Sequence, residues 1–298
     1  MSAAGPPQGA NCAPAFGGSA AAEWVNEAAS VGVHMIAIDI AAADKVFPNG
    51  VRALEPVTLG VREGEFATIV GPSGCGKSTL LRMVAGLLPP SGGRVRLWPG
   101  ASVSDREPAR RLAFVFQSAT LMAWADVERN VRLPLDLGHA RVTDAARASE
   151  RVERALALVG LEDFRRAYPR ELSGGMQMRA SIARALVTEP SLLLMDEPFG
   201  ALDEITRARL DRELSELGAR EALTILFVTY SIYEAVFLST RVFVMSPRPG
   251  RIIDEVVIDE PHPRTDAFRV SPAFAQHCAR LSAMLASAME NETESASS

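Results

Sequence analysis

The chain has 298 residues, 48% of them hydrophobic and 22% charged, and it carries a net charge of −5. This composition is typical of a globular protein with one large or two small domains. The acidic balance, without any long basic run, gives no electrostatic reason to expect nucleic acid as a partner. No apolar run approaches the length of a membrane span.

The cysteines and the N-terminal segment exclude further classes. Cys12, Cys75 and Cys278 lie far apart, without metal-binding or disulfide spacing, which favours a reducing cytoplasm. The first basic residue is Lys45, so the chain begins without the positively charged region of a secretory signal. Residues 1–34 are rich in Ala, Gly, Pro and Ser, and we expect them to form a disordered arm.

Short β-prone segments follow at residues 35–40, 53–59 and 66–70, with turn-forming residues between them. The segment after the third strand, residues 71–79, fits the G-x-x-x-x-G-K-[ST] pattern of a phosphate-binding loop. Apolar residues at helical spacing then continue until Pro89-Pro90. Strand, glycine loop and helix is the context that this motif requires.

The physical reason for the motif is the anion site that it forms. Glycines let successive backbone N–H groups point inward, and the helix N-terminus adds a partial positive charge. We expect Lys77 to reach the β- and γ-phosphates of a nucleotide and Ser78 to offer its hydroxyl to Mg²⁺. The expected nucleotide-binding residues are Gly71, Pro72, Ser73, Gly74, Cys75, Gly76, Lys77, Ser78 and Thr79.

The middle of the chain changes character twice. Residues 94–98 and 112–116 predict two more strands, the second followed by the amide of Gln117. Residues 119–171 show helical periodicity and predict a helical insert. From there on helices alternate with strands at residues 192–195, 224–229 and 241–245, which indicates a mainly parallel sheet covered on both faces. An amphipathic helix over 271–288 and a frayed end complete the prediction.

Two adjacent carboxylates follow the strand at residues 192–195. Phosphoryl transfer to water needs a metal ion, positive charge on the phosphates and a positioned water molecule. Asp196 stands where an acid would hold Mg²⁺, and Glu197 beside it could act as the general base. A solvated acidic loop is the plain alternative, and the phosphate-binding loop upstream favours the catalytic interpretation.

Five motifs, in this order and spacing, resemble the ATP-binding subunit of an ABC transporter. The resemblance covers about residues 35–264. It implies an α/β fold: a P-loop NTPase core with a mainly parallel sheet, an N-terminal antiparallel β subdomain, a helical subdomain at about 119–171, and residues 265–298 as a C-terminal helix and frayed tail. The five motifs are the phosphate-binding loop, Gln117, residues 172–176, residues 192–198 and residues 201–203.

The resemblance also implies a mechanism. Two subunits would pair head to tail, each ATP lying between the loop of one chain and the signature Ser173, Gly174 and Gly175 of the other. These residues precede a helix, which suits a second anion site. Gln117 would reach Mg²⁺ and the attacking water, and Asp203 would lie at the dimer seam. Phe47 matches the position of a ring that stacks on adenine, although simple core packing remains open.

Within the family, the closest resemblance is to importers of nitrate, aliphatic sulfonates and taurine. The stretches that carry it are Leu172–Arg179, Met195–Arg207 and Phe227–Ile252. It implies a second ATP-binding subunit, integral membrane permease subunits and a solute-binding protein as partners, at the cytoplasmic face of the membrane. Residues 121–131, with Trp124, would receive the permease. Those partners bind the solute, and a vitamin precursor is equally conceivable.

One position departs from the family pattern. Tyr230 stands where the family has a histidine that contacts the γ-phosphate. A tyrosine hydroxyl is neutral near pH 7 and can donate one hydrogen bond. Either Tyr230 supports slow turnover, or the chain is an ATP-binding regulatory clamp with weak hydrolysis. A third hypothesis, an ATPase acting on nucleic acid or ribosomes, is disfavoured by the single signature, the short insert and the acidic charge.

Overall fold

The computed structural model describes Met1 and residues 35–99, 111–137, 141–200 and 202–295, with the backbone alone for residues 291–295. The chain divides into two units, Met1–His34 and Met35–Ser298, and every element below belongs to the second. Apart from Met1, the arm expected over residues 1–34 lies outside the described residues, and so does Cys12.

The first sheet is antiparallel and has the strand order β2-β1-β4. Its strands are β1 (Ile36–Val46), β2 (Arg52–Arg62) and β4 (Gly92–Leu97). Buried and more exposed residues largely alternate along β2, so one face of this sheet is packed and the other meets solvent. The first two strands are longer than the sequence predicted; β1 continues past residue 40 through the charged pair Asp44 and Lys45.

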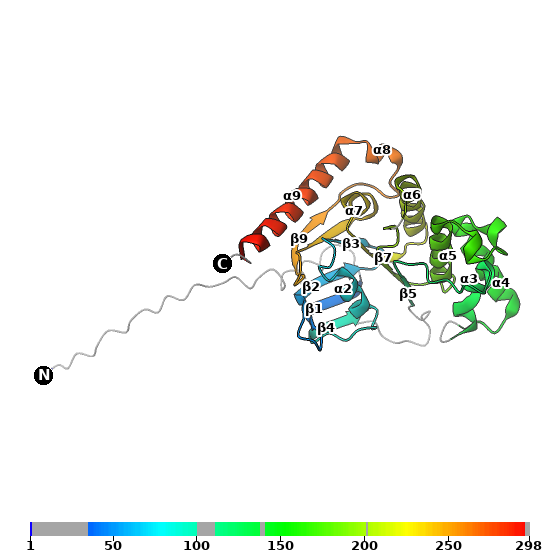
Figure 1. Cartoon of the computed structure of the whole chain (residues 1–298), viewed down its shortest axis with the longest axis horizontal. Coiled ribbons are helices and arrows are strands. Elements are labelled where there is room, and N and C mark those ends of the chain that lie inside the picture. The colour runs from blue at the N-terminus through cyan, green and yellow to red at the C-terminus, as the bar shows by residue number, and fades with distance from the viewer. Residues whose placement is uncertain (2–34, 100–110, 138–140, 201, 296–298) are drawn as a thin grey trace. The chain divides into compact units, whose positions relative to one another are not determined.

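The second sheet has six strands in the order β5-β6-β7-β3-β8-β9 (Figure 1). The five strands from β5 to β8 are parallel, whereas β9 runs antiparallel to β8. The strands β3, β6, β7 and β8 are buried along their whole length, as their continuous apolar runs predict. The strands are β3 (Phe66–Val70), β5 (Leu112–Val115), β6 (Leu192–Asp196), β7 (Thr224–Thr229), β8 (Arg241–Met245) and β9 (Ile252–Val257).

The helices lie against this sheet or in the insert. Helices α3, α4 and the short η2 and η3 fall within the predicted insert, where Asp144 caps α4 and Gly160 ends it in a left-handed conformation. The helices are α2 (Lys77–Val84), α3 (Val127–Asp136), α4 (Ala145–Val159), η2 (Glu162–Phe164), η3 (Pro169–Glu171), α5 (Gly174–Leu186), α6 (Glu204–Arg220), α7 (Ile232–Leu238), α8 (Asp266–Arg269) and α9 (Pro272–Ser295).

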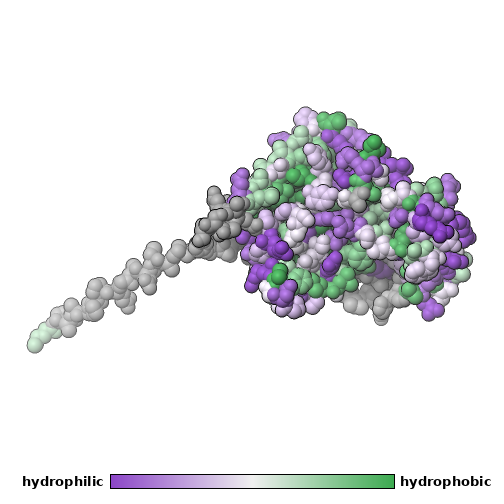
Figure 2. Space-filling model, viewed as in Figure 1, coloured by the Kyte–Doolittle hydropathy of each residue, from purple (hydrophilic) through white to green (hydrophobic). Residues whose placement is uncertain are grey.

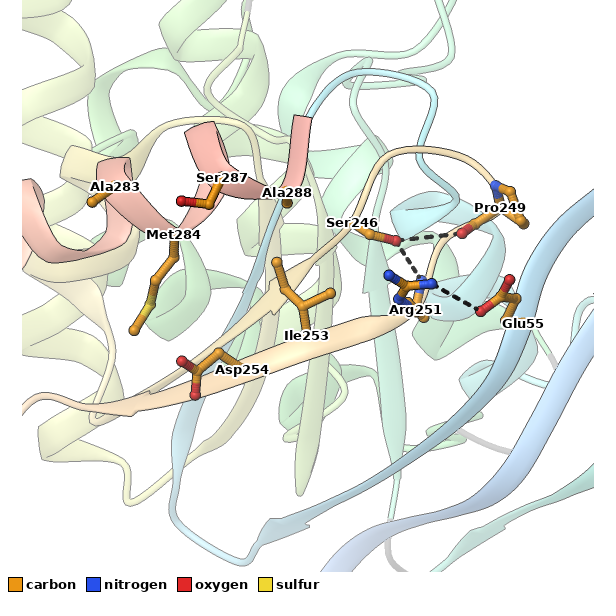
Figure 3. Close-up of a pocket in the computed structure, with 10 residues that line it drawn as sticks. All are labelled: Glu55, Ser246, Pro249, Arg251, Ile253, Asp254, Ala283, Met284, Ser287 and Ala288. Carbon is orange, nitrogen blue, oxygen red and sulfur yellow. Dashed lines mark hydrogen bonds and ion pairs between the residues drawn. The ribbon is translucent and has the colours of Figure 1, made fainter. Parts of the chain in front are cut away.

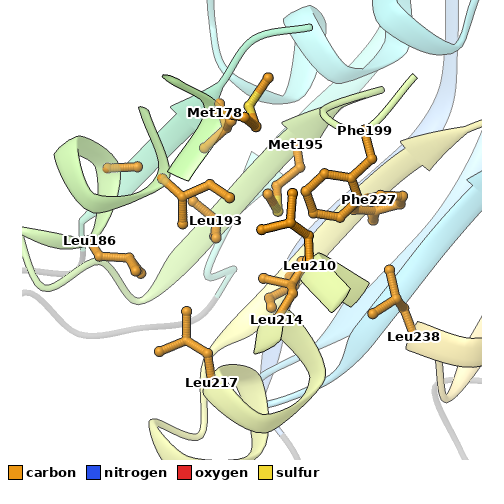
Figure 4. Packing of buried hydrophobic residues seen from close by; sticks show 14 of the residues in the cluster. Met178, Leu186, Leu193, Met195, Phe199, Leu210, Leu214, Leu217, Phe227 and Leu238 are labelled. Atoms are coloured by element: carbon orange, nitrogen blue, oxygen red, sulfur yellow. The ribbon is translucent and has the colours of Figure 1, made fainter. Parts of the chain in front are cut away.

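Two apolar clusters fill the core, one on each face of the central sheet. Successive residues of a strand point to opposite faces. Thus Leu193 and Met195 of β6 join the cluster with α5, α6 and α7, whereas Leu192 and Leu194 join the one with α2 and the antiparallel sheet. Figure 4 shows the first cluster, in which Phe199 lies beside Phe227 of β7.

Helix α9 covers the predicted helix 271–288 and continues into the segment that was expected to fray. Its residues Phe274 and Leu281 are buried, so this helix belongs to the core of the unit. On the face seen in Figure 2, hydrophilic and hydrophobic residues are interspersed. No helix among the described residues combines the length and the apolar character needed to cross a bilayer.

Candidate functional site

The phosphate-binding loop lies between the end of β3 and the start of α2. Gly76 is the residue before the first helical turn and has φ 109°. A Cβ atom on Gly76 would lie 2.7 Å from Leu54 Cδ2 and 2.9 Å from the Ala53 carbonyl oxygen. Only glycine fits both this conformation and this close approach. The loop is therefore packed tightly against β2, which holds its curvature.

Lys77 lies almost wholly inside this loop, with 3% of the residue exposed. Its Nζ donates hydrogen bonds to the carbonyl oxygens of Gly71 and Pro72, each at 2.9 Å, and lies 3.3 Å from Glu197 Oε1. A buried ammonium group needs such oxygens to offset its lost hydration. Burial raises the pKa of the neighbouring Cys75 thiol, which therefore stays neutral near pH 7.

The two carboxylates at the end of β6, Asp196 within the strand and Glu197 just after it, turn toward different partners. Ser78 Oγ donates to Asp196 Oδ1 at 2.6 Å, and Gln117 Nε2 donates to Glu197 Oε2 at 3.3 Å. Glu197 has φ 45°, an uncommon conformation for a residue with a side chain, and its N–H donates to the Val228 carbonyl at 2.9 Å. This turn directs Glu197 to the loop and to Gln117 at once.

The oxygens of Ser78 and Asp196 are suitable ligands for Mg²⁺. This ion prefers oxygen ligands and commonly takes only one or two from a protein, the remainder being water and substrate phosphates. Across the described ranges no group of three or more His, Cys, Asp or Glu side chains gathers as a metal site. A hydroxyl and a carboxylate 2.6 Å apart fit an ion that is bound together with phosphates.

Ser173 and Asp203 occupy a second place, at the starts of α5 and α6. Each caps its helix: Ser173 Oγ accepts from the Met176 N–H at 3.3 Å, and Asp203 Oδ1 accepts from the Thr206 N–H at 3.0 Å. The hydrogen bond from Thr206 lowers the pKa of Asp203.

The two caps lie close together because small residues line the approach. A Cβ atom on Gly175 would lie 2.8 Å from Thr206 Cγ2, and one on Gly174 would lie 3.8 Å from Leu202 Cδ2. Helix α5 lies with α3 and α4, apart from α2, in Figure 1. The signature residues therefore lie at the start of a different helix from the one that follows the phosphate-binding loop.

Tyr230 and Phe47 lie at the edges of the site. Tyr230, just after β7, is 47% exposed, and its hydroxyl donates to the Gly200 carbonyl oxygen at 3.1 Å. Phe47 follows β1 and packs partly against the antiparallel sheet, with Lys45 Nζ 5.9 Å from its ring centroid. Its side chain is partly buried, so stacking on adenine stays a prediction beside core packing.

Three further residues near the site were not predicted from the sequence: Thr229, Arg207 and Glu234. Glu234 of α7 is buried, and it contacts the Thr229 hydroxyl and Arg207 of α6. The sequence signal that could have identified Glu234 is its place as a single acid within the apolar segment 232–238. Burying a carboxylate is costly unless it is paired, so such an acid predicts a specific partner.

A cavity of about 680 Å³ lies elsewhere, between α9, β9 and residues 246–251 (Figure 3). At its edge Arg251 Nη1 lies 3.6 Å from Glu55 Oε2, and Ser246 Oγ donates to the Pro249 carbonyl at 3.3 Å. None of the residues that line it is one of the predicted nucleotide-binding or catalytic residues.

The comparisons with known proteins agree with this geometry. Residues 54–200 match the family described as ABC transporter. An ATP-binding protein of Brucella abortus is 46% identical over 228 residues, 76% of this chain and 85% of that one. The taurine import ATP-binding protein of Rhizobium johnstonii is 47% identical over 210 residues, 70% and 78% respectively. An aliphatic sulfonates import ATP-binding protein of Bacillus licheniformis is 40% identical over 245 residues, 80% and 90%.

Solved structures give the same result. A dimeric structure of MJ0796, a bacterial ABC transporter cassette, is 31% identical, with a TM-score of 0.65 over 75% of this chain and all of that one. A post-hydrolysis dimer of the same cassette, bound to ADP and Pi, is similar with the same TM-score and 30% identity, over the same shares of the two chains. The chain therefore belongs to the ABC transporter family, as one of its ATP-binding, ATP-hydrolysing subunits.

Proposed function

We propose that the chain hydrolyses ATP to drive the import of a small solute of the aliphatic sulfonate or taurine type. One observation carries the catalytic part: Lys77 contacts Glu197, which contacts Gln117, and Ser78 contacts Asp196 in the same place. The taurine and aliphatic sulfonate import proteins among its relatives support the class of solute. Nitrate or a vitamin precursor are the alternative solutes within the same group.

Each residue has a distinct role in this proposal. The backbone N–H groups of residues 71–79 and the Lys77 ammonium bind the phosphates of ATP.

The metal ion and the attacking water have their own residues. Ser78 and Asp196 would hold Mg²⁺, with Gln117 beside the ion, and Mg²⁺ would supply positive charge to the phosphate oxygens. Glu197 accepts a proton from the attacking water. The Tyr230 hydroxyl exchanges the Gly200 carbonyl for the γ-phosphate as its acceptor, and Phe47 stacks on the adenine.

The second half of each ATP site comes from another copy of the chain. Its Ser173, Gly174 and Gly175 lie before helix α5, whose N-terminus attracts negative charge. Asp203 lies beside them at the start of α6 and contributes to the dimer seam. The dimeric structures of a similar cassette support this arrangement.

The membrane partners follow from the proposed import function. Permease subunits would bind around residues 121–131, where Trp124 is 77% exposed, and would place the chain at the cytoplasmic face of the membrane. A solute-binding protein would deliver the solute to them. The same proposal takes residues 35–264 as the ATP-binding domain and residues 265–298 as a C-terminal helix and tail.

Substituting Glu197 tests the catalytic assignment. Glu197→Gln keeps the shape of the side chain but removes the base, so turnover is expected to fall about 100-fold or more while ATP binding persists. The variant is also expected to accumulate as an ATP-bound dimer, measured by light scattering. Glu221→Gln, an exposed residue at the end of α6, is the matched control. Unchanged turnover in Glu197→Gln would refute the role given to this residue.

The alternative of a regulatory ATP-binding clamp has less support. Its only basis is Tyr230, whereas Lys77, Glu197 and Gln117 retain mutual contacts. The direct test compares ATP hydrolysis by the native chain and by Tyr230→His in complex with the permease. Measurable native turnover supports a transport motor, and turnover that appears only with histidine supports the clamp.

A further inference from the structure

Glu234 is a buried acid in the first turns of helix α7, with 2% of its surface exposed. One of its oxygens accepts a hydrogen bond from the Thr229 hydroxyl, and the other lies 3.3 Å from Arg207 Nε. An ion pair in the protein interior gains little stability, because desolvation offsets the attraction between the charges. The position of Glu234 therefore suggests a task other than holding the fold together.

The first contact of Glu234 organises the turn that carries Tyr230. Thr229 Oγ1 donates to Glu234 and accepts from the Ser231 N–H at 2.9 Å, and the Glu234 N–H donates to Ser231 Oγ at 3.3 Å. Tyr230 lies between these two anchored residues. Glu234 therefore holds the backbone on both sides of the residue that we assign to the γ-phosphate.

The second contact organises the loop that follows Glu197. Arg207 donates to the Leu202 carbonyl from Nη2 at 2.9 Å, and its Nε lies 3.4 Å from the Phe199 carbonyl. The Tyr230 hydroxyl donates to Gly200 of the same loop at 3.1 Å. A closed ring of contacts results, which runs from Tyr230 through Glu234 and Arg207 to this loop and back to Tyr230.

We propose that Glu234 is a positioning residue for ATP hydrolysis, and that its carboxylate sets the turn of Tyr230 and the loop residues Phe199, Gly200 and Leu202 in one geometry. This inference rests on the proposed function. When the carboxylate is ionised, it accepts the hydrogen bond from Thr229 and balances the charge of Arg207 at the same time. The protonated form loses the ion pair, so the loop beside Glu197 and Asp203 loses one of its constraints.

The surroundings of Glu234 give it a titration in the neutral range. Burial first, and then the negative charge of Asp211, raise its pKa to about 7, against the opposing effects of Thr229 and Arg207. The charged groups that face it are Arg207, Glu204 and Asp211 on α6, with Arg269 of α8 bound to Asp211 at 2.7 Å. Turnover is therefore expected to fall as the pH decreases through about 7 and Glu234 takes up a proton.

The primary experiment measures kcat and KM for ATP between pH 5.5 and 9 with the full chain. Glu234→Gln is expected to lower kcat about 10- to 100-fold, because small displacements at a catalytic site have effects of that size. The plot of kcat against pH for this variant is also expected to lack the inflection that the native chain shows near pH 7, while KM changes by less than about twofold. Glu221→Gln is the matched control, and it is expected to keep the native profile, including any inflection due to ATP itself.

Two further variants move the inflection in opposite directions. Thr229→Val removes a hydrogen bond that lowers the pKa of Glu234, so the inflection is expected to rise by about one pH unit. Asp211→Asn removes a negative charge that raises this pKa, so the inflection is expected to fall by a similar amount. A purely structural role for Glu234 predicts lower activity without these opposite shifts, and that result would overturn the inference.

A measurement without ATP separates this inference from the proposed function. Because the folded chain holds the Glu234 proton up to about pH 7, folding stability from this group is present below pH 4.5 and is lost as the pH rises through about 7. The melting temperature of the native chain is expected to decrease across this window more than that of Glu234→Gln. Equal pH dependence in both chains would overturn the inference, whereas failure to bind ATP would overturn the proposed function instead.

Discussion

Lys77 brings a positive charge into a nearly closed loop, and its contacts define how the site can respond to a nucleotide. Its Nζ bonds two carbonyl oxygens of the loop and lies beside the Glu197 carboxylate. Phosphate oxygens are stronger acceptors than neutral carbonyls, because charged hydrogen bonds are about twice as strong. Lys77 can therefore exchange these partners for phosphates, and Glu197 is then free to turn toward water.

The hydroxyl of Tyr230 is expected to contribute to the rate of ATP hydrolysis. Tyr230→Phe removes the hydroxyl that donates to Gly200 and that we assign to the γ-phosphate. A hydrogen bond to a charged group contributes about 1.5–3 kcal/mol, which corresponds to a decrease in kcat of about 10- to 150-fold. Tyr233→Phe, at an exposed tyrosine in the first turn of the following helix α7, is the control and is expected to leave kcat unchanged. If Tyr230→Phe also keeps the native kcat, its hydroxyl has no part in turnover.

Single residues also show the limits of prediction from sequence. The phosphate-binding loop, Asp196 and Glu197 were predictable because fixed spacing and a preceding strand express their chemistry locally. Glu234 and Arg207 lie 27 positions apart in the sequence, and no local sequence pattern links the two residues. Their contact depends on how α6 packs on α7, which the sequence pattern does not specify.

At the scale of elements, the junction between α5 and α6 supplies the second prediction. A Cβ atom on Gly175 would lie 2.8 Å from Thr206 Cγ2, which is closer than side-chain atoms pack. Gly175→Ala should therefore push α6 away from α5, displace Asp203 and weaken ATP-dependent dimer formation. The effect is expected to be smaller on folding than on dimer formation, since Ser173, Gly174 and Asp203 beside this contact are exposed.

The partner position offers a direct control for this prediction. Thr206→Ser removes Cγ2 and keeps the backbone N–H that donates to Asp203. The double variant Gly175→Ala with Thr206→Ser should recover most of the dimer formed by the native chain, measured by light scattering with ATP in the Glu197→Gln background. No recovery would mean that the methyl group of Thr206 is not the cause of the defect.

Elements differ in how well their sequence predicts them. The strands at 224–229 and 241–245 were predicted with the bounds that the structure gives, because both are continuous apolar runs between polar residues. The direction of β9 was not predicted, because it depends on residues 246–251, which return the chain beside β8 rather than across the sheet. The hydrophobic pattern of a segment identifies it as a strand, but the residues that connect it to the previous strand decide which strand it pairs with and in which direction.

At the scale of the whole molecule, the two apolar clusters connect the ATP site to the rest of the unit. The cluster that contains Phe199 and Phe227 also contains Phe274 and Leu281 of the C-terminal helix. Since Phe199 lies two residues after Glu197, the packing of α9 and the geometry of the catalytic loop share one core. Interiors are close-packed, so a change at one end of this cluster is transmitted as strain to its neighbours.

Helix α9 therefore supplies the last prediction, which concerns stability. Leu281 is completely buried, and Leu281→Ala removes apolar surface and leaves a cavity, which is expected to cost about 2–5 kcal/mol of unfolding free energy. Val270→Ala, at a position that is 85% exposed, is the control and should change stability by less than about 0.5 kcal/mol. Urea denaturation measures both. Equal stability of the two variants would show that α9 folds independently of the core, and the C-terminal segment would then be an extension that the ATP-binding unit does not need.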